Sequence, residues 1–137
     1  MKVENKSDPK KILIVDDDDF IIDLYAEALQ KAGYTVFTAN LPSIGLAKVE
    51  LNRPDLVLLD VGMPEMNGLQ FLETIKKDLR TSEIPVMFLS NIRDDRTIKE
   101  GLEKGAVGYL LKTSLTPSQV AAEVGKTLQQ LTGLSSA

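Results

Sequence analysis

The chain has 137 residues, enough for one domain, and its 43% hydrophobic and 26% charged residues are typical of globular proteins. Its formal net charge of −4 argues against nucleic-acid binding, because phosphate backbones are bound by basic surfaces. Cysteine and histidine are both absent, which excludes disulfides, thiolate or imidazole metal sites and Ser-His-Asp hydrolysis. Any metal must be held by oxygen atoms, which favours Mg²⁺ or Ca²⁺.

The chain contains no run that approaches the roughly 20 apolar residues needed to span a bilayer. Its first residues, Met1 to Lys11, are polar and lack the apolar core of a signal peptide. We therefore expect a cytoplasmic protein without membrane contact. Residues 1–10 are expected to form a flexible N-terminal segment ahead of one folded domain.

The first predicted elements are a strand and a helix. The apolar run Ile12–Val15 indicates a buried strand, and Asp18 and Asp19 are interpreted as caps of the helix that follows. This helix is expected to end at Gly33 and to share one inward face among Phe20, Leu24, Ala28 and Ala32, with Tyr25 and Leu29 beside them.

Two further strand–helix pairs are predicted next. A strand at Thr35–Thr38 leads into a helix that begins at Pro42 and ends before Arg53 and its following proline. A strand at Leu56–Asp60 leads into a helix capped by Asn67, whose inward residues are expected to be Leu69, Leu72 and Ile75.

The last predicted pairs complete the pattern. A strand at Val86–Leu89 precedes a helix from about Asp94 to Lys104. A strand at Gly108–Leu111 precedes a helix that opens on a capping box at Thr116, with an apolar stripe of Val120, Val124, Leu128 and Leu131. Strands that alternate with helices imply an α/β fold, with a parallel sheet covered by helices on both faces.

Polar side chains follow these strands at the edge where ligands bind in such folds. Asp16 and Asp17 follow the first strand, Asp60 ends the third, Ser90 follows the fourth and Lys112 follows the last. Converging carboxylates repel each other and favour a divalent cation between them, for which Mg²⁺ suits oxygen ligands. A metal, a lysine and a hydroxyl around one carboxylate are the parts needed for phosphoryl transfer to that carboxylate.

In these residues the chain resembles the receiver domain of bacterial two-component response regulators, and in particular the stand-alone chemotaxis type. The matching fragments are Ile12–Asp18, Asp55–Asp60, Met63 and Pro64, Gly68, Leu89 and Ser90, Gly105 and Ala106, and Gly108–Lys112. The resemblance implies a flavodoxin-like (βα)5 three-layer sandwich whose parallel sheet has the strand order 2-1-3-4-5. It also implies a receiver domain over residues 11–132, followed by a C-terminal tail over residues 133–137.

The resemblance implies that Asp60 is the phospho-acceptor and that the cofactor is Mg²⁺. Asp17 would bind the ion directly, and Asp16 would hold it partly through water. The backbone carbonyl of Gly62 would complete the protein ligands beside Asp60 itself.

The resemblance also implies a switch. Lys112 would pair with the phosphoryl group, Ser90 would move toward it, and Tyr109 would swing inward behind Ser90. The face formed by the last two helices and the strand between them would then change its affinity for partners.

The implied partners are a sensor histidine kinase or histidine phosphotransfer protein as donor, and a downstream protein effector. The same face is a possible homodimer interface, and direct contact with nucleic acid is not implied. The protein would not be an enzyme but a signalling switch that catalyses only its own phosphorylation and autodephosphorylation.

Three positions depart from the usual family pattern. Gly62 replaces a larger polar residue, which leaves the phosphoryl group less screened from water. Asn91 replaces a small residue and is expected to crowd the phosphoryl pocket. Thr113 replaces a proline that is usually joined to the lysine by a cis bond. Because a cis bond before threonine costs about 2.5–4 kcal/mol, we predict a trans Lys112–Thr113 bond and a locally shifted loop.

Two other functions remain open. A phosphatase or phosphotransferase acting on small molecules also forms an aspartyl-phosphate, but such enzymes usually carry a second acid where Gly62 stands. A degenerate receiver would bind partners without taking phosphate. The presence of Asp16, Asp17, Asp60 and Lys112 argues against that second alternative.

Overall fold

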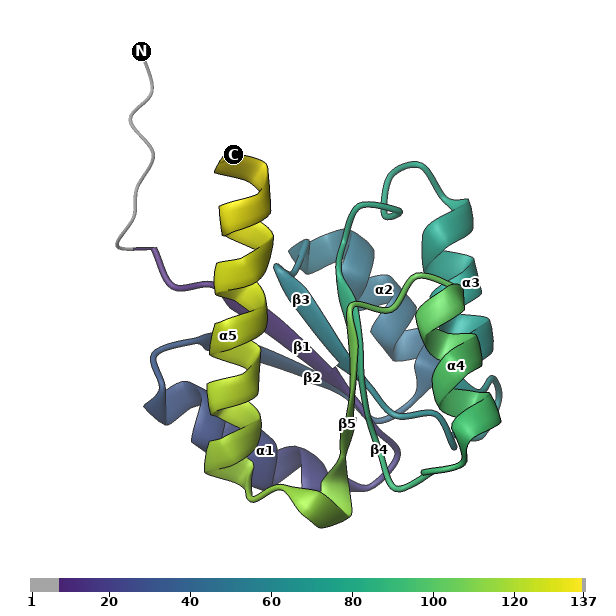
Figure 1. Ribbon diagram of the computed structural model, residues 1–137, viewed down its shortest axis with the longest axis horizontal. Helices are drawn as coiled ribbons and strands as arrows, with labels where there is room; N and C mark the ends of the chain where they lie inside the picture. Colours follow the sequence, from purple (N-terminus) through teal and green to yellow (C-terminus); the bar gives the residue numbers. More distant parts are fainter. Residues whose placement is uncertain (1–7, 137) are drawn as a thin grey trace.

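The computed structural model describes residues 8–136, so residues 1–7 of the expected flexible segment lie outside it. Strands alternate with helices along the described chain (Figure 1). The strands are β1 (Lys11–Val15), β2 (Thr35–Ala39), β3 (Leu56–Leu59), β4 (Val86–Ser90) and β5 (Gly108–Leu111). The helices are α1 (Asp19–Lys31), α2 (Pro42–Asn52), α3 (Gly68–Lys77), α4 (Asp95–Glu103) and α5 (Pro117–Ser136), with a 3₁₀ turn at Lys112–Ser114.

The strands form one parallel sheet in the order β2-β1-β3-β4-β5, which confirms the order that the family resemblance implied. α1 and α5 cover one face of this sheet, while α2, α3 and α4 cover the other (Figure 1). The predicted three-layer α/β fold is therefore confirmed. The observed strand ends agree with the predicted ones to within one residue.

Strand side chains alternate between two cores, one on each face of the sheet. The core beneath α2 and α3 contains Leu13, Val15, Val57, Leu59 and Phe88. The core beneath α1 and α5 contains Ile12, Ile14, Leu56, Leu58 and Met87. Because both faces of β1, β3 and β4 are buried, these strands carry nearly continuous apolar runs rather than an alternation of apolar and polar residues.

Helix α1 turns a different face inward from the one predicted. Phe20 and Leu24 are exposed by 69% and 37%, whereas Ile22, Tyr25 and Leu29 are buried. The prediction was correct for Tyr25 and Leu29 but wrong for the stripe that begins at Phe20. Apolar residues lie on two sides of α1, so their spacing alone does not decide which side meets the sheet.

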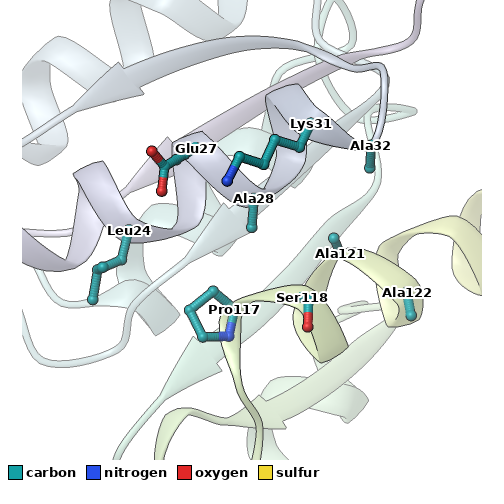
Figure 2. A pocket seen from close by; sticks show the side chains of 9 residues that line it. All are labelled: Leu24, Glu27, Ala28, Lys31, Ala32, Pro117, Ser118, Ala121 and Ala122. Carbon is teal, nitrogen blue, oxygen red and sulfur yellow. The ribbon is translucent and has the colours of Figure 1, made fainter.

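Part of the outward stripe lines a groove between α1 and the start of α5. Leu24, Ala28 and Ala32 form one wall, and Pro117 and Ala121 form the other (Figure 2). The groove has a volume of about 540 Å³. Small alanine side chains on both helices leave this space open.

The two sides of α1 are expected to respond very differently to truncation. Leu29→Ala should lower the free energy of unfolding by about 2–5 kcal/mol, because it leaves a cavity in the core. Phe20→Ala should change it by less than about 0.5 kcal/mol, because that ring is mostly in solvent. Urea denaturation followed by circular dichroism measures both. Equal losses would show that Phe20 packs in the core after all.

Side-chain caps fix where the helices begin. Asp18 accepts hydrogen bonds from two N–H groups of the first turn of α1, as predicted, whereas Asp19 is the first helical residue rather than a cap. Asn67 forms a capping box with the glutamine three residues later, and Thr116 does the same. Local sequence signals therefore set these boundaries.

The end of α5 differs from the prediction. The helix continues to Ser136, so residues 133–136 belong to it. The predicted apolar stripe ends at Leu131, but Leu134 follows three residues later in the sequence, at the spacing with which a helical stripe continues. The division into a receiver domain over residues 11–132 and a tail stays a prediction.

Candidate functional site

The carboxylates predicted to meet do so at the carboxyl ends of β1 and β3. Val15 pairs with Leu59 in the register of these strands, so Asp16 and Asp60 are the next residue of each. Asp16 and Asp60 are buried, with 2% and 8% exposure, while Asp17 is exposed. One carboxylate oxygen of each of these three residues lies within 4.8 Å of the others. The structure thus brings together all three predicted acidic ligands.

Backbone N–H groups hold one oxygen of each buried carboxylate. The N–H of Asp18 donates to Oδ1 of Asp16 at 3.0 Å, and the N–H of Val61 donates to Oδ1 of Asp60 at 2.8 Å. These bonds fix the orientation of both side chains. The second oxygen of each carboxylate is the one that Lys112 contacts.

Lys112 extends from the end of β5 and bridges the two buried acids. Its Nζ lies 2.6 Å from Oδ2 of Asp16 and 3.4 Å from Oδ2 of Asp60, and its side chain is only 9% exposed. The predicted amine therefore stands beside the predicted acceptor. In this structure, its closer partner is Asp16.

The charges in the site are not balanced by Lys112 alone. Burial raises the pKa of Asp16, although the Lys112 amine and the Asp18 N–H both lower it. Burial by itself would lower the pKa of Lys112, but the contacts with Asp16 and Asp60 raise it overall. Three carboxylates face one ammonium, so an additional cation would be stabilised here. The donors are all oxygen atoms, which fits a hard divalent ion such as Mg²⁺.

Ser90 and Tyr109 lie behind the acceptor and are joined through Ile92. The Ser90 side chain is buried at the end of β4, and its Oγ accepts a hydrogen bond from the N–H of Ile92 at 3.1 Å. The Tyr109 hydroxyl donates to the carbonyl of Ile92 at 2.5 Å. Burial raises the pKa of Tyr109. Tyr109 therefore points inward, toward the loop that follows β4.

Residues 12–124 match the family described as response regulator receiver domain, which covers most of the chain. The chain belongs to this family. Receiver domains are signalling switches of two-component systems that are phosphorylated on an aspartate. The family indicated by the sequence motifs is thereby confirmed.

Curated relatives of this receiver domain include transcriptional regulators. It is 35% identical over 123 residues to the alkaline phosphatase synthesis transcriptional regulatory protein PhoP of Bacillus subtilis, covering 88% of this chain and 49% of that protein. It is 37% identical over 103 residues to the transcriptional regulatory protein CrdR of Helicobacter pylori, covering 75% and 48%. The receiver chain therefore spans about half the length of these relatives.

Similar solved structures are matched over nearly their full length. The chemotaxis protein CheY4 of Vibrio cholerae has a TM-score of 0.80 at 30% identity, covering 87% of this chain and 98% of that one. A CheY-like receiver domain protein from Methanospirillum hungatei has a TM-score of 0.81 at 30% identity, covering 89% and 95%. Within residues 8–136, no helix combines the length and apolar character needed to cross a membrane.

The positions that depart from the receiver pattern lie at the rim of the site. Gly62 and Asn91 are exposed, and a Cβ added at Gly62 would lie 3.8 Å from Cδ1 of Ile92. The Lys112–Thr113 bond is trans, as predicted. The sequence did not predict a role for Ile92. An isoleucine in a polar loop does not indicate that its backbone N–H and carbonyl bond to the hydroxyl groups of Ser90 and Tyr109.

Proposed function

We propose that Asp60 accepts a phosphoryl group from the phosphohistidine of a sensor kinase or of a histidine phosphotransfer protein. A carboxylate oxygen of Asp60 attacks the phosphorus, the phosphorus–nitrogen bond breaks, and the donor imidazole leaves with the bonding electron pair. The observation that supports this most is the Nζ of Lys112, held between Asp16 and Asp60. A fixed positive charge thus lies beside the carboxylate that would accept the phosphoryl group, where it would stabilise the negative charge on the phosphoryl oxygens.

The proposed cofactor is Mg²⁺, held by Asp16, Asp17, Asp60 and the backbone carbonyl of Gly62. The clustered carboxylate oxygens and the raised pKa of Asp16 support this proposal. The bound ion supplies positive charge for the oxygens of the phosphoryl group. Asp60 provides the nucleophilic oxygen, and Lys112 and Ser90 provide N–H and O–H donors.

Phosphorylation would act on partners through the face formed by α4, β5 and α5. A phosphoryl group adds about one negative charge or slightly more at the end of β3, which biases an existing equilibrium rather than building a new fold. The proposed partners are the histidine-containing donor and a downstream protein effector, with a possible homodimer through the same face. We further propose a cytoplasmic location and no catalysis beyond its own phosphorylation and autodephosphorylation.

Two alternatives fit the site less well. A phosphatase or phosphotransferase would need an acid near the leaving group, but Gly62 has no side chain and its surroundings are open. A degenerate receiver would lack some of the residues needed to accept phosphate. Here the lysine, both buried acids and the buried Ser90 stand together at one edge of the sheet.

Incubation with acetyl phosphate and Mg²⁺ tests the proposal. Intact mass spectrometry should show a gain of about 80 Da, the mass of one phosphoryl group. Asp60→Asn should abolish the gain, whereas Asp23→Asn, which removes an exposed acid on α1, should retain it. Chelation of Mg²⁺ should prevent the reaction. Absence of the gain in the wild-type chain, or its persistence in Asp60→Asn, would falsify the assignment.

A further inference from the structure

The start of helix α2, which lies wholly within the described chain, lacks a side-chain cap from its own sequence. Leu41 occupies the N-cap position, where its apolar side chain accepts no hydrogen bond, and Pro42 follows it. The first turn of this helix also contains no acidic residue. The first N–H groups of a helix need acceptors, and a negative charge beside them is favourable. An acceptor from another segment is therefore expected at this end of α2.

Glu65 supplies such an acceptor from the loop between β3 and α3. Its Oε1 accepts a hydrogen bond from the N–H of Ser43, the second residue of α2, at 3.3 Å. The same loop contains Asp60, the proposed phospho-acceptor, and Gly62, whose carbonyl is a proposed Mg²⁺ ligand. The carboxylate of Glu65 thus connects the start of α2 to the loop that carries these two groups.

The backbone of Glu65 has a conformation that is costly for a residue with a side chain. Its φ is +69°, in the left-handed region where glycine is the usual residue. The N–H of Met66 donates to the carbonyl of Pro64 at 2.7 Å, which closes a γ-turn around Glu65. Such conformations persist where surrounding contacts fix them. The hydrogen bond from Ser43 is one contact that fixes this turn.

The segment before α2 is bonded to the loop that follows β1. The N–H of Asp16 donates to the carbonyl of Ala39 at 3.1 Å. The next residue, Asn40, donates from its side-chain Nδ2 to Oδ1 of Asp19 at 3.1 Å. Asp19 is the first residue of α1. These two bonds therefore hold both ends of the short segment that contains the proposed ligands Asp16 and Asp17.

Close packing leaves the first turn of α2 little freedom to shift. A Cβ added at Gly45 would lie 3.0 Å from Cγ2 of Val15 and 3.1 Å from Cε2 of Phe71. Val15 is the last residue of β1 and comes directly before Asp16. The first turn of α2 is thus packed against the strand that leads into one ligand-bearing loop, and it accepts the side chain of Glu65 from the other.

We propose that the first turn of α2 and the residue Asn40 before it position the two loops that carry the proposed Mg²⁺ ligands. Glu65 and Asn40 are the positioning residues. Neither is a proposed ligand: Glu65 acts through the backbone of the β3–α3 loop, and Asn40 acts through Asp19. The part that concerns Mg²⁺ rests on the proposed function, whereas the attachment of the loops to α2 does not.

Mg²⁺ affinity tests the proposal through two variants, Glu65→Ala and Glu65→Gln. Both remove the same negative charge, but only glutamine keeps an oxygen that can accept from the N–H of Ser43. The rise in unfolding free energy with Mg²⁺ concentration, measured by urea titration, gives the dissociation constant of the folded chain. We expect Glu65→Ala to raise this constant about 10-fold, at the lower end of the cost of losing a residue that orients metal ligands. Glu65→Gln should keep it near the wild-type value.

Two further variants complete the comparison. Asn40→Ala removes the bond to Asp19 without changing the charge, and it should also weaken Mg²⁺ binding. Glu83→Ala is the matched control for lost charge, because it removes an exposed acid that precedes β4 at the opposite edge of the sheet. It should leave the dissociation constant unchanged. An unchanged constant in Glu65→Ala or Asn40→Ala overturns the role of that residue. An equal rise in Glu65→Gln or Glu83→Ala shows an effect of charge and overturns the proposal as well.

NMR of the chain without Mg²⁺ distinguishes a failure of this proposal from a failure of the proposed function. The amide proton signal of Ser43 should move by several linewidths in Glu65→Ala and stay near its wild-type position in Glu65→Gln. The ¹⁵N order parameters of Gly62 and Met63 should fall in Glu65→Ala, because their loop is no longer attached to α2. A wild-type chain that Mg²⁺ does not stabilise contradicts the proposed function, and these signals still test the attachment. An unmoved Ser43 signal with unchanged order parameters in Glu65→Ala overturns it.

Discussion

Replacing Lys112 with methionine is expected to lower the free energy of unfolding by about 2–3 kcal/mol at neutral pH. The substitution keeps the aliphatic stem but removes the ammonium that lies 2.6 Å from Asp16 and 3.4 Å from Asp60. Two buried carboxylates are then left without a cation. The cost should stay below that of a fully enclosed pair, because Asp17 at the same site is exposed to solvent.

The loss should depend on pH in a defined direction. The pKa of Asp16 is already raised above 3.8 in the folded chain, and without Lys112 it should rise further. The folded variant then binds more protons than the unfolded one, so its stability falls as pH rises through and above 3.8, the ordinary pKa of an aspartate. In the wild-type chain, the raised pKa of Lys112 contributes stability that is present below the ordinary lysine pKa of 10.5 and is lost at more alkaline pH.

The same substitution should also slow phosphorylation. Removing one fixed charge that faces developing phosphoryl charge typically costs about 100-fold in rate, so Lys112→Met should phosphorylate roughly that much more slowly with acetyl phosphate. Added Mg²⁺ should restore part of the stability, because it supplies positive charge to the same carboxylates. Urea titrations from acidic to neutral pH, with and without Mg²⁺, measure these effects.

Lys104→Met is the matched control for this experiment. Lys104 pairs with Glu73 at 2.7 Å, but the two side chains are 29% and 42% exposed. Its loss should cost less than about 1 kcal/mol and leave phosphorylation unchanged. If both variants lost the same stability, the contacts of Lys112 with Asp16 and Asp60 would be worth no more than an exposed ion pair. If Lys112→Met were phosphorylated at the wild-type rate, its ammonium would not stabilise the phosphoryl charge.

The fold was predictable because its signals are local. Apolar runs such as Leu56–Leu59 have no polar alternation, which is expected only where both faces of a strand are buried. Caps such as Asn67 mark helix starts through bonds within one turn. The meeting of Asp16, Asp60 and Lys112 followed from these signals, because parallel strands end at one edge.

The features that were not predictable depend on packing between distant segments. The choice of the inward face of α1 is made by α5 and the sheet, so Phe20 could not be placed from the spacing within α1. The inward position of Tyr109 depends on Phe88 and on the carbonyl of Ile92, which come from β4 and the loop after it. In the sequence, Phe88 looks like any core phenylalanine and Ile92 like any loop isoleucine, so neither indicates a contact with Tyr109.

Gly68→Ala should be among the most disruptive single-methyl additions near the site. A Cβ at this position would lie 2.4 Å from the carbonyl oxygen of Asp60 and 2.8 Å from Cα of Val61. Both are backbone atoms, and the N–H of Gly68 also donates to the carbonyl of Val61 at 2.7 Å. The backbone therefore cannot yield without moving Asp60. We expect a loss of about 2–3 kcal/mol in unfolding free energy, at the upper end of the usual cost of overpacking.

The reason for this glycine is space rather than backbone conformation, because positive φ angles among the described glycines occur at Gly33 and Gly105. Gly62→Ala is the matched control in the same loop, since its Cβ would meet Ile92 at an ordinary 3.8 Å. That variant should keep wild-type stability. Gly68→Ala should also slow phosphorylation by acetyl phosphate even where urea titration shows the chain to be folded, because the added methyl displaces the acceptor backbone from Lys112. Wild-type stability and rate in Gly68→Ala would show that α3 is free to move away from β3, and that the acceptor is not fixed by this contact.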